Sequence, residues 1–332
     1  LFPTLIALAF AGYVVFLNFR GASSAAKLQA FLTKALLCGM LLAMGVSIVT
    51  GSPDNAMPVF SQVAGAGGGV AETESTNLLA GIVSVLVLTP FFYAGFDTIP
   101  QQAEEAAEGL NWNKFGKIIT LALLAAGGFY MVCIYSFGTI LPWNEFVAQP
   151  VPALACLKNI NMILYVAMLV IATLGPMGPM NSFYGATSRI MLAMGRKGQL
   201  PEKFAEVDEK SGAPKLACVV LGIITVIGPF LGKNMLIPLT NVSALAFILS
   251  CTMVALACLK MRYTEPDLPR PYKVPGGKFG ILLAILAGAI IIGLLVLPFS
   301  PASLNMVEWS IVLGWLVVGL ILMFATKARA KK

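Results

Sequence analysis

Nine long apolar runs dominate this sequence, and they determine what the chain can fold into. A helix that crosses a bilayer needs about 20 mostly apolar residues. Runs of this kind predict spans at Phe2 to Leu17, Leu28 to Val49, Leu78 to Phe96, Ile118 to Leu141, Met162 to Met194, Leu216 to Leu231, Leu236 to Leu259, Phe279 to Leu297 and Val307 to Thr326. Charged residues make up only 11% of the 332 positions, too few to cover a soluble surface of this size. We therefore predict an all-α integral membrane protein, with residues 1–332 forming one transmembrane domain in the lipid bilayer, and exclude a soluble enzyme.

The chain contains no histidine, which excludes imidazole proton shuttles, histidine-containing zinc sites and nucleophiles activated by histidine. Its six cysteines stand singly in or beside the apolar runs, without CxxC spacing, so we interpret them as small buried hydrophobes. We expect neither a metal nor another cofactor. The net charge of +7 raises the question of a nucleic acid partner, but the placement of the charges indicates membrane topology instead.

The lysines and arginines predict the orientation of the chain. When alternate loops are assigned to one side of the membrane, all but two of the 22 basic residues fall on the same side, the exceptions being Lys158 and Lys233. Because cytoplasmic loops carry the excess of basic residues, we predict that the carboxyl terminus, with its basic tail at 327–332, is cytoplasmic and that residues 50–77 form an outer loop. The sequence begins without methionine at the edge of an apolar run, so we expect an amino-terminal truncation.

Polar and helix-breaking residues interrupt the third run, in LTPFFYAGFDTIPQQAEEAAEG. Pro90, Gly95 and Pro100 stand there with Asp97 close by. Unwound backbone at membrane depth presents the ends of two half-helices and free carbonyls, which suit the charged groups of an amino acid. The alternative is a helix that ends at Phe96 on the cytoplasmic side, since about 20 apolar residues already precede that point. Hydropathy leaves both readings open.

The fifth run carries two prolines, Pro176 and Pro179, each next to or near a glycine. A proline inside a spanning helix leaves carbonyls unpaired, which calls for polar neighbours or a cavity. A plain kink is the alternative and the more common outcome.

Lys34 lies about six residues inside the second run, deeper than a loop residue. One reading is an interfacial anchor whose ammonium group reaches back to the inner surface. The other is a functional ammonium group that stands in the place of a sodium ion or exchanges a proton, because a desolvated lysine titrates within reach of neutral pH.

Four segments make the chain resemble the amino acid permeases of the amino acid, polyamine and organocation transporter superfamily. They are NFRGASSAAKLQAFLTK, FFYAGFDTIPQQAEE, TSRIMLAMGRKGQLPEKFAEVDEKSGAPK and KMRYTEPDLPRPYKVPGG. The resemblance implies a LeuT-like bundle of two inverted five-helix repeats followed by two further helices. The nine runs then correspond to helices four to twelve, and the family's fourth helix runs from outside to inside, as the charges require of the first run. The first three helices would be missing, so the chain alone should not transport.

The resemblance also implies roles for particular residues. For substrate binding these are the broken helix at Ala94, Gly95, Phe96 and Asp97, the aromatic gate Phe91 and the pocket residue Phe183. For coupling they are Lys34, Gly178 and Pro179, although many relatives carry a hydroxyl residue at the position of Pro179. For an inner gate they are Glu104, Glu105 and Arg189. Ordinary interfacial charge is the alternative for the gate residues. Asn241 and Ser243 are further candidates for contact with substrate or with an outer gate.

The sequence thus predicts a secondary transporter of the cytoplasmic membrane that moves an amino acid or related amine by alternating access. Coupling is expected to protons or to exchange of solutes rather than to sodium, and the aromatic residues around the breaks favour a neutral substrate. The rival hypothesis is a membrane-embedded transferase that uses Asp97, Glu104 and Glu105. Against it, the chain lacks histidine, and glycine and proline breaks suit binding better than chemistry.

Overall fold

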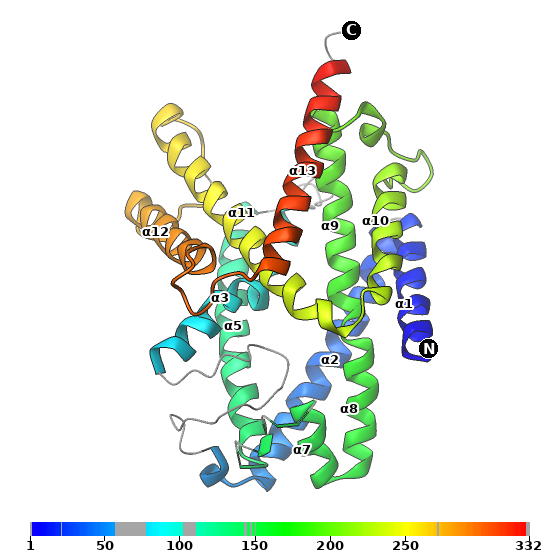
Figure 1. The fold of residues 1–332 in the computed structure, drawn as a ribbon, viewed down its shortest axis with the longest axis vertical. Helices are drawn as coiled ribbons and strands as arrows, with labels where there is room; N and C mark the ends of the chain where they lie inside the picture. Colours follow the sequence, from blue (N-terminus) through cyan, green and yellow to red (C-terminus); the bar gives the residue numbers. More distant parts are fainter. Residues whose placement is uncertain are drawn as a thin grey trace.

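The computed structural model describes residues 2–20, 22–56, 78–101, 111–142, 145–146, 148–149, 151–270 and 272–329. The regular elements in these ranges are all helices (Figure 1). The α-helices are α1 (Phe2–Phe19), α2 (Ala22–Thr50), α3 (Leu78–Tyr93), α4 (Thr98–Gln101), α5 (Trp112–Gly138), α7 (Pro152–Ile160), α8 (Met162–Leu174), α9 (Met177–Arg196), α10 (Lys215–Ile227), α11 (Leu236–Thr264), α12 (Gly277–Val296) and α13 (Met306–Arg329). Short 3-10 helices are η1 (Pro53–Ala56), η3 (Glu202–Ala205), η4 (Gly228–Phe230) and η5 (Lys233–Met235).

Six helical segments in the described part of the chain are long and apolar enough to cross a membrane, judged by length and composition. They are Gln29–Thr50, Trp112–Gly138, Met162–Arg196, Leu236–Thr264, Gly277–Val296 and Met306–Phe324. Shorter apolar helices at Thr4–Phe19, Leu79–Tyr93 and Lys215–Phe230 occupy the three remaining predicted runs. The prediction of a membrane helix bundle is confirmed.

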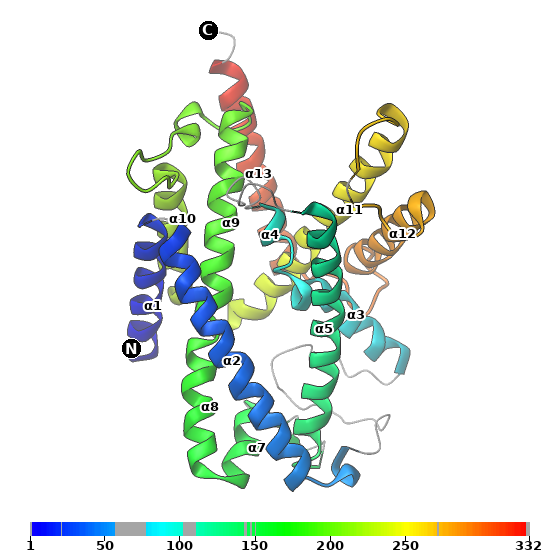
Figure 2. The same ribbon diagram turned by 180° about the vertical axis from the view of Figure 1, so that it is seen from behind.

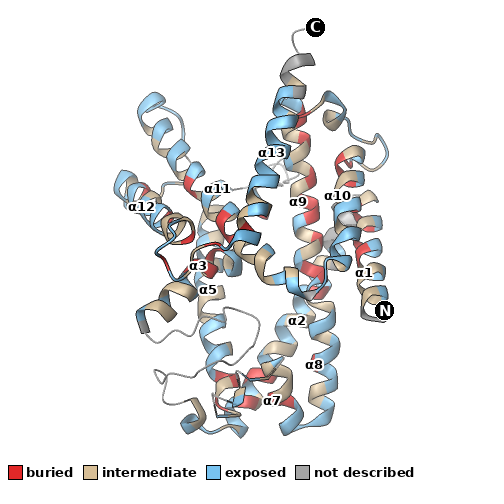
Figure 3. Ribbon diagram, in the orientation of Figure 1, coloured by how far each residue is buried: buried red, intermediate tan, exposed pale blue. Residues whose placement is uncertain are grey.

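The outer surface of the bundle is apolar. Many large hydrophobic side chains are exposed along the helices, among them Phe31, Leu121 and Ile134, and exposed positions follow the outward faces of the long helices (Figure 3). An apolar surface of this extent is unusual for a soluble protein but is what a lipid environment requires.

The helices form two groups. In the first, α1, α9 and α10 contact one another, and α2 packs along α8 and α9. In the second, α11 packs against α3, α12 and α13. α4, which follows α3 in the chain, contacts α9 of the first group. α5 packs against α2, and its Tyr130 hydroxyl donates to the Phe92 carbonyl of α3, so the segment between α3 and α4 lies at the junction of the two groups (Figures 1 and 2).

Close approach of helices within each group depends on small residues. In the second group, a Cβ atom at Gly288 of α12 would lie 2.1 Å from the Thr252 hydroxyl oxygen of α11, so only glycine fits there. In the first group, Gly222 of α10 lets the Tyr184 hydroxyl come near, and that hydroxyl donates to the Cys218 carbonyl. Small residues at helix contacts are typical of packing in membranes.

The two ends of the molecule agree with the predicted alternation of loops. The carboxyl-terminal ends of α9 and α13 lie at one end together with the α9–α10 loop, whereas α7 and the end of α2 lie at the other (Figures 1 and 2). That the end with α13 faces the cytoplasm stays a prediction. Most of the predicted outer loop, residues 57–77, and the last residues of the basic tail, 330–332, lie outside the described residues.

Candidate functional site

The helix that begins with α3 is interrupted at Ala94–Asp97 and resumes as α4. Gly95 adopts φ +130°, a backbone conformation that side-chain-bearing residues rarely take. The amide of Ala94 bonds to the Phe91 carbonyl, which closes the last turn of α3 at 3.2 Å. α3 therefore ends at Tyr93, and after a four-residue turn one further helical turn follows at Thr98–Gln101. That this break lies at membrane depth stays a prediction.

The side chain of Asp97 stabilises the interruption from within. Its Oδ1 accepts a hydrogen bond from the Gly95 amide at 2.9 Å, and its Oδ2 accepts one from Gln101 Nε2 at 2.8 Å. The Thr98 hydroxyl donates to the Gly95 carbonyl at 2.6 Å. Because each carboxylate oxygen accepts a hydrogen bond from a residue close by in the chain, Asp97 stabilises the turn between α3 and α4.

Backbone carbonyls of the broken helix remain as acceptors. The carbonyls of Tyr93 and Ala94 accept no hydrogen bond from any residue that the structure describes. The Phe92 carbonyl accepts one from the Tyr130 hydroxyl of α5 at 2.9 Å. One turn earlier, Pro90 cannot donate to the Leu86 carbonyl, and the Thr89 hydroxyl donates to it instead. The carboxyl end of α3 thus offers two open carbonyls at the negative end of its dipole.

Aromatic rings surround the interruption. Tyr130 lies 6.1 Å, centroid to centroid, from both Phe92 and Tyr93, and Phe96 meets Phe247 of α11 edge to face at 5.9 Å. Phe91, the predicted gate, is 41% exposed, and Phe183 of α9, the predicted pocket residue, is 37% exposed. Tyr130 and Phe247 were not predicted from the sequence, because an aromatic residue inside an apolar run carries no signal of its neighbours.

The junction of α8 and α9 is a kink. Gly175 and Pro176 both keep right-handed helical angles, and the Gly175 amide still bonds to the Ile171 carbonyl at 2.8 Å. Of the two predicted coupling residues here, Gly178 is buried and Pro179 is exposed. The more common alternative, a plain kink, describes the backbone at this point.

Gln29, rather than Lys34, is the residue of α2 that faces Gly178. A Cβ atom at Gly178 would lie 3.5 Å from Gln29 Nε2, and the side-chain oxygen of Gln29 is buried without a hydrogen-bond partner among the described residues. Lys34 is exposed on α2 and forms no ion pair or hydrogen bond with any described residue. The structure brings α2 and α9 together, as the predicted coupling site requires, but it does not place the Lys34 ammonium against Gly178.

A cavity of about 480 Å³, called the inner cavity after the predicted orientation, lies between α4 and the carboxyl-terminal part of α9. Gln101 of α4 lines it together with Arg189, Arg196 and Lys197. Arg189 Nη1 also donates to the Ser188 hydroxyl at 2.9 Å. The other two predicted gate residues, Glu104 and Glu105, lie outside the described residues.

Asn241 is committed to a partner on α13. Its Nδ2 donates to Glu308 Oε1 at 2.6 Å, and Glu308 Oε2 accepts from the Asn305 amide at 2.7 Å. Glu308 is only 2% exposed. Ser243, the other residue suggested near an outer gate, is exposed.

Comparison with known sequences identifies the family. A family model described as amino acid permease matches residues 2–323, nearly the whole chain. The chain belongs to the amino acid permease family. It is therefore an integral membrane protein, as its apolar helices indicate.

Several transporters are similar in sequence to this permease. The branched-chain amino acid permease BcaP of Bacillus subtilis is 26% identical over 255 residues, 76% of this chain and 52% of BcaP. The human cystine/glutamate transporter is 26% identical over 266 residues, 79% of this chain and 50% of that protein. The aspartate-proton symporter of Bacillus subtilis is 30% identical over 164 residues, 48% of this chain and 28% of the symporter. The chain spans about half the length of the first two relatives.

Two of the segments that carry the permease resemblance have structural roles at one end of the bundle. In the segment that begins TSRIMLAMGRKG, Gly195 lies against η3, where a Cβ atom would come within 2.8 Å of the backbone of Phe204 and Ala205. In the segment KMRYTEPDLPRPYKVPGG, Arg270 donates to the carbonyls of Met261 at 3.1 Å and Glu265 at 2.6 Å, which caps the carboxyl end of α11.

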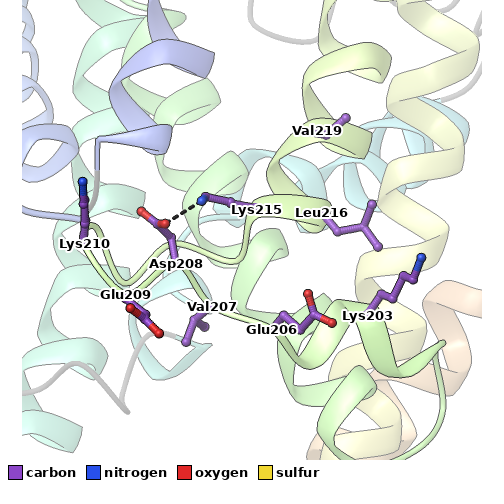
Figure 4. Close-up of a pocket in the computed structure, with 9 residues that line it drawn as sticks. All are labelled: Lys203, Glu206, Val207, Asp208, Glu209, Lys210, Lys215, Leu216 and Val219. Carbon is purple, nitrogen blue, oxygen red and sulfur yellow. Dashed lines mark ion pairs between the residues drawn. The ribbon is translucent and has the colours of Figure 1, made fainter.

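The α9–α10 loop of the permease is held by an ion pair. Lys215 Nζ lies 2.6 Å from Asp208 Oδ1, beside a cavity of about 730 Å³ that three lysines and three carboxylates line (Figure 4). Asp208 Oδ2 accepts from the Ser211 amide and hydroxyl. The ion pair and these hydrogen bonds lower the pKa of the Asp208 carboxyl to about 2.

Proposed function

We propose that this protein is a secondary transporter that carries an amino acid or related amine across the cytoplasmic membrane. The interrupted helix between α3 and α4 supports the proposal most directly, because it leaves the carbonyls of Tyr93 and Ala94 open at the junction of the two helix groups. Open carbonyls at the carboxyl end of a half-helix attract an ammonium group. The names of the relatives agree with this reading, since each is a permease, transporter or symporter of amino acids.

A neutral, apolar amino acid fits the proposed site best. The rings of Phe91, Phe96 and Tyr130 lie around the break, and the one carboxylate within it, Asp97, already accepts two hydrogen bonds. An apolar side chain would pack against these rings. The branched-chain permease BcaP is named for substrates of this kind.

Alternating access is proposed to come from rocking of one helix group against the other around this site. The groups touch where α4 contacts α9, and α5 bridges them by packing on α2 and bonding through Tyr130 to α3. At the α4–α9 contact, Gln101 and Arg189 line the inner cavity, which supports Arg189 as one half of an inner gate with Glu104 or Glu105. Closure of this contact would separate the substrate from the cytoplasm.

Transport is proposed to be coupled to protons or to exchange of solutes, with the Lys34 ammonium group in the place of a sodium ion. The support is its position inside α2, the helix that packs along α9 at Gly178. The aspartate-proton symporter among the relatives is named for proton coupling. The transferase remains the alternative hypothesis, although each carboxylate oxygen of Asp97 accepts a hydrogen bond from within its own turn.

Uptake into liposomes tests the proposal, with the purified protein in its full-length encoded form. Labelled alanine and leucine are offered under an inward proton gradient, under an inward sodium gradient, or with unlabelled substrate inside. We expect accumulation with the proton gradient or with internal substrate, and none that depends on sodium. Group transfer to a lipid or solute without any uptake would overturn the proposal in favour of the transferase.

A further inference from the structure

Tyr130 holds one of the carbonyls that the broken helix releases. Its hydroxyl donates to the Phe92 carbonyl at 2.9 Å, and its ring packs against the rings of Phe92 and Tyr93. One turn earlier on α5, Gly127 lies so close to Tyr93 that a Cβ atom would come 2.5 Å from the Tyr93 hydroxyl. Two successive turns of α5 therefore fix the last turn of α3.

The hydroxyl changes the number of acceptors at the break. Without it, the carbonyls of Phe92, Tyr93 and Ala94 would all be open, since none of them accepts a backbone hydrogen bond from a described residue outside α3. With it, one lone pair of the Phe92 carbonyl is taken, and only the carbonyls of Tyr93 and Ala94 keep both. A primary ammonium group has three N–H donors, whereas an N-methylated ammonium group has two.

We propose that Tyr130 is a specificity-determining residue, which withholds the Phe92 carbonyl from the substrate and so limits the preference of the site for primary over N-methylated amines. This inference rests on the proposed function, because it assumes that the substrate ammonium binds at the α3–α4 break. It assigns to α5 a selective role that follows from a single hydroxyl group. The ring of Tyr130 serves packing, and only the oxygen sets the selectivity.

The variant Tyr130→Phe tests the inference, because it removes the hydroxyl and keeps the ring. KM values for alanine and for N-methylalanine are measured with the purified protein in liposomes. The freed Phe92 carbonyl then accepts the third donor of the primary ammonium. The KM for N-methylalanine divided by the KM for alanine should therefore rise about tenfold, the effect of one charge-assisted hydrogen bond. Tyr135→Phe is the matched control, since Tyr135 is an exposed tyrosine of the same helix, and its ratio should equal that of the wild type.

The outcomes separate the inference from the proposed function. Uptake by the wild type and by Tyr130→Phe with an unchanged ratio overturns the inference alone. Absence of uptake by the wild type overturns the proposed function and the inference with it. If Tyr130→Phe folds without transporting, the shifts in melting temperature caused by alanine and N-methylalanine report the same ratio, and an unchanged ratio again overturns the inference.

Discussion

Asn18 of α1 and Asn181 of α9 join their side-chain amides in the interior of the first helix group. Asn18 Nδ2 donates to Asn181 Oδ1 at 2.9 Å and to the Val14 carbonyl at 3.0 Å. The two side chains are 2% and 4% exposed. Because an amide cannot be left unsatisfied among apolar side chains without cost, this bond favours one register of α1 against α9.

A double-mutant cycle at this pair should show a direct interaction. We expect Asn18→Leu and Asn181→Leu to have a coupling energy of about 0.6–1.7 kcal/mol, the range of hydrogen bonds between helices in membranes. Unfolding of the single and double variants in lipid or detergent measures it. Additive effects of the two substitutions would show that the bond contributes nothing to the packing of α1 on α9.

Replacement of Lys34 should remove coupling and leave the fold intact, because the side chain is exposed and has no described partner. We expect Lys34→Ala to reduce gradient-driven uptake by about 5- to 150-fold, the usual range of coupling between two sites. Lys27→Ala, at an exposed lysine nearer the start of α2, is the control and should transport normally. Sodium-dependent uptake that survives Lys34→Ala would contradict the proposed coupling.

Asn241 should matter for stability and not for substrate affinity. Asn241→Ala leaves the buried Glu308 carboxylate without one of its donors, which should lower the free energy of unfolding by about 1–3 kcal/mol. Thermal unfolding and the KM for uptake are measured on the same preparations, with Ser250→Ala as a control at an exposed serine of the same helix. A raised KM with unchanged stability would instead place Asn241 in contact with substrate.

The ion pair in the α9–α10 loop predicts a pH dependence of stability. The pKa of Asp208 is lowered to about 2 from an ordinary value of 3.8, so the folded state binds the proton more weakly than the unfolded chain. The stabilisation is therefore complete above about pH 5 and is lost as the pH falls toward 2. Asp208→Asn should unfold at a lower temperature than the wild type at pH 5, and the difference should shrink on acidification.

Lys215→Gln provides an independent check of the same ion pair. It removes the first cause of the lowered pKa of Asp208 while leaving the carboxylate in place. We expect it to reduce the acid sensitivity of unfolding relative to the wild type. A difference between wild type and Asp208→Asn that stays constant from pH 5 to about pH 2 would show that the carboxylate gains no stability from its ionised form.

The positions of the helices and of the main break were predictable from the sequence. Apolar runs of sufficient length have few alternatives to membrane helices, and Pro90 and Gly95 marked an interruption. The second pair of prolines allowed both a kink and an open break, because the same residue types support either. Gly175 and Pro176 remain helical, and the hydrogen bond of Gly175 to Ile171 decides for the kink.

Contacts between distant residues were not predictable. Tyr130 and Phe92 are separated by 38 positions and Asn241 and Glu308 by 67, and a single sequence carries no signal of either pairing. The sequence also could not show that Asp97 is engaged by Gly95 and Gln101, since a carboxylate near a break fits substrate binding equally well. Which of the residues predicted for binding, coupling and gating act in transport stays a prediction.

The most direct test of the account compares uptake of labelled alanine by the wild type, Gly95→Ala and Gly12→Ala. A Cβ atom at either glycine would meet nothing within 4 Å, but only Gly95 has a positive φ, which costs another residue about 1–3 kcal/mol. We predict that Gly12→Ala transports like the wild type, while Gly95→Ala loses at least about tenfold in initial rate because the break closes or shifts. Wild-type uptake by Gly95→Ala would contradict the claim that the interrupted helix binds the substrate.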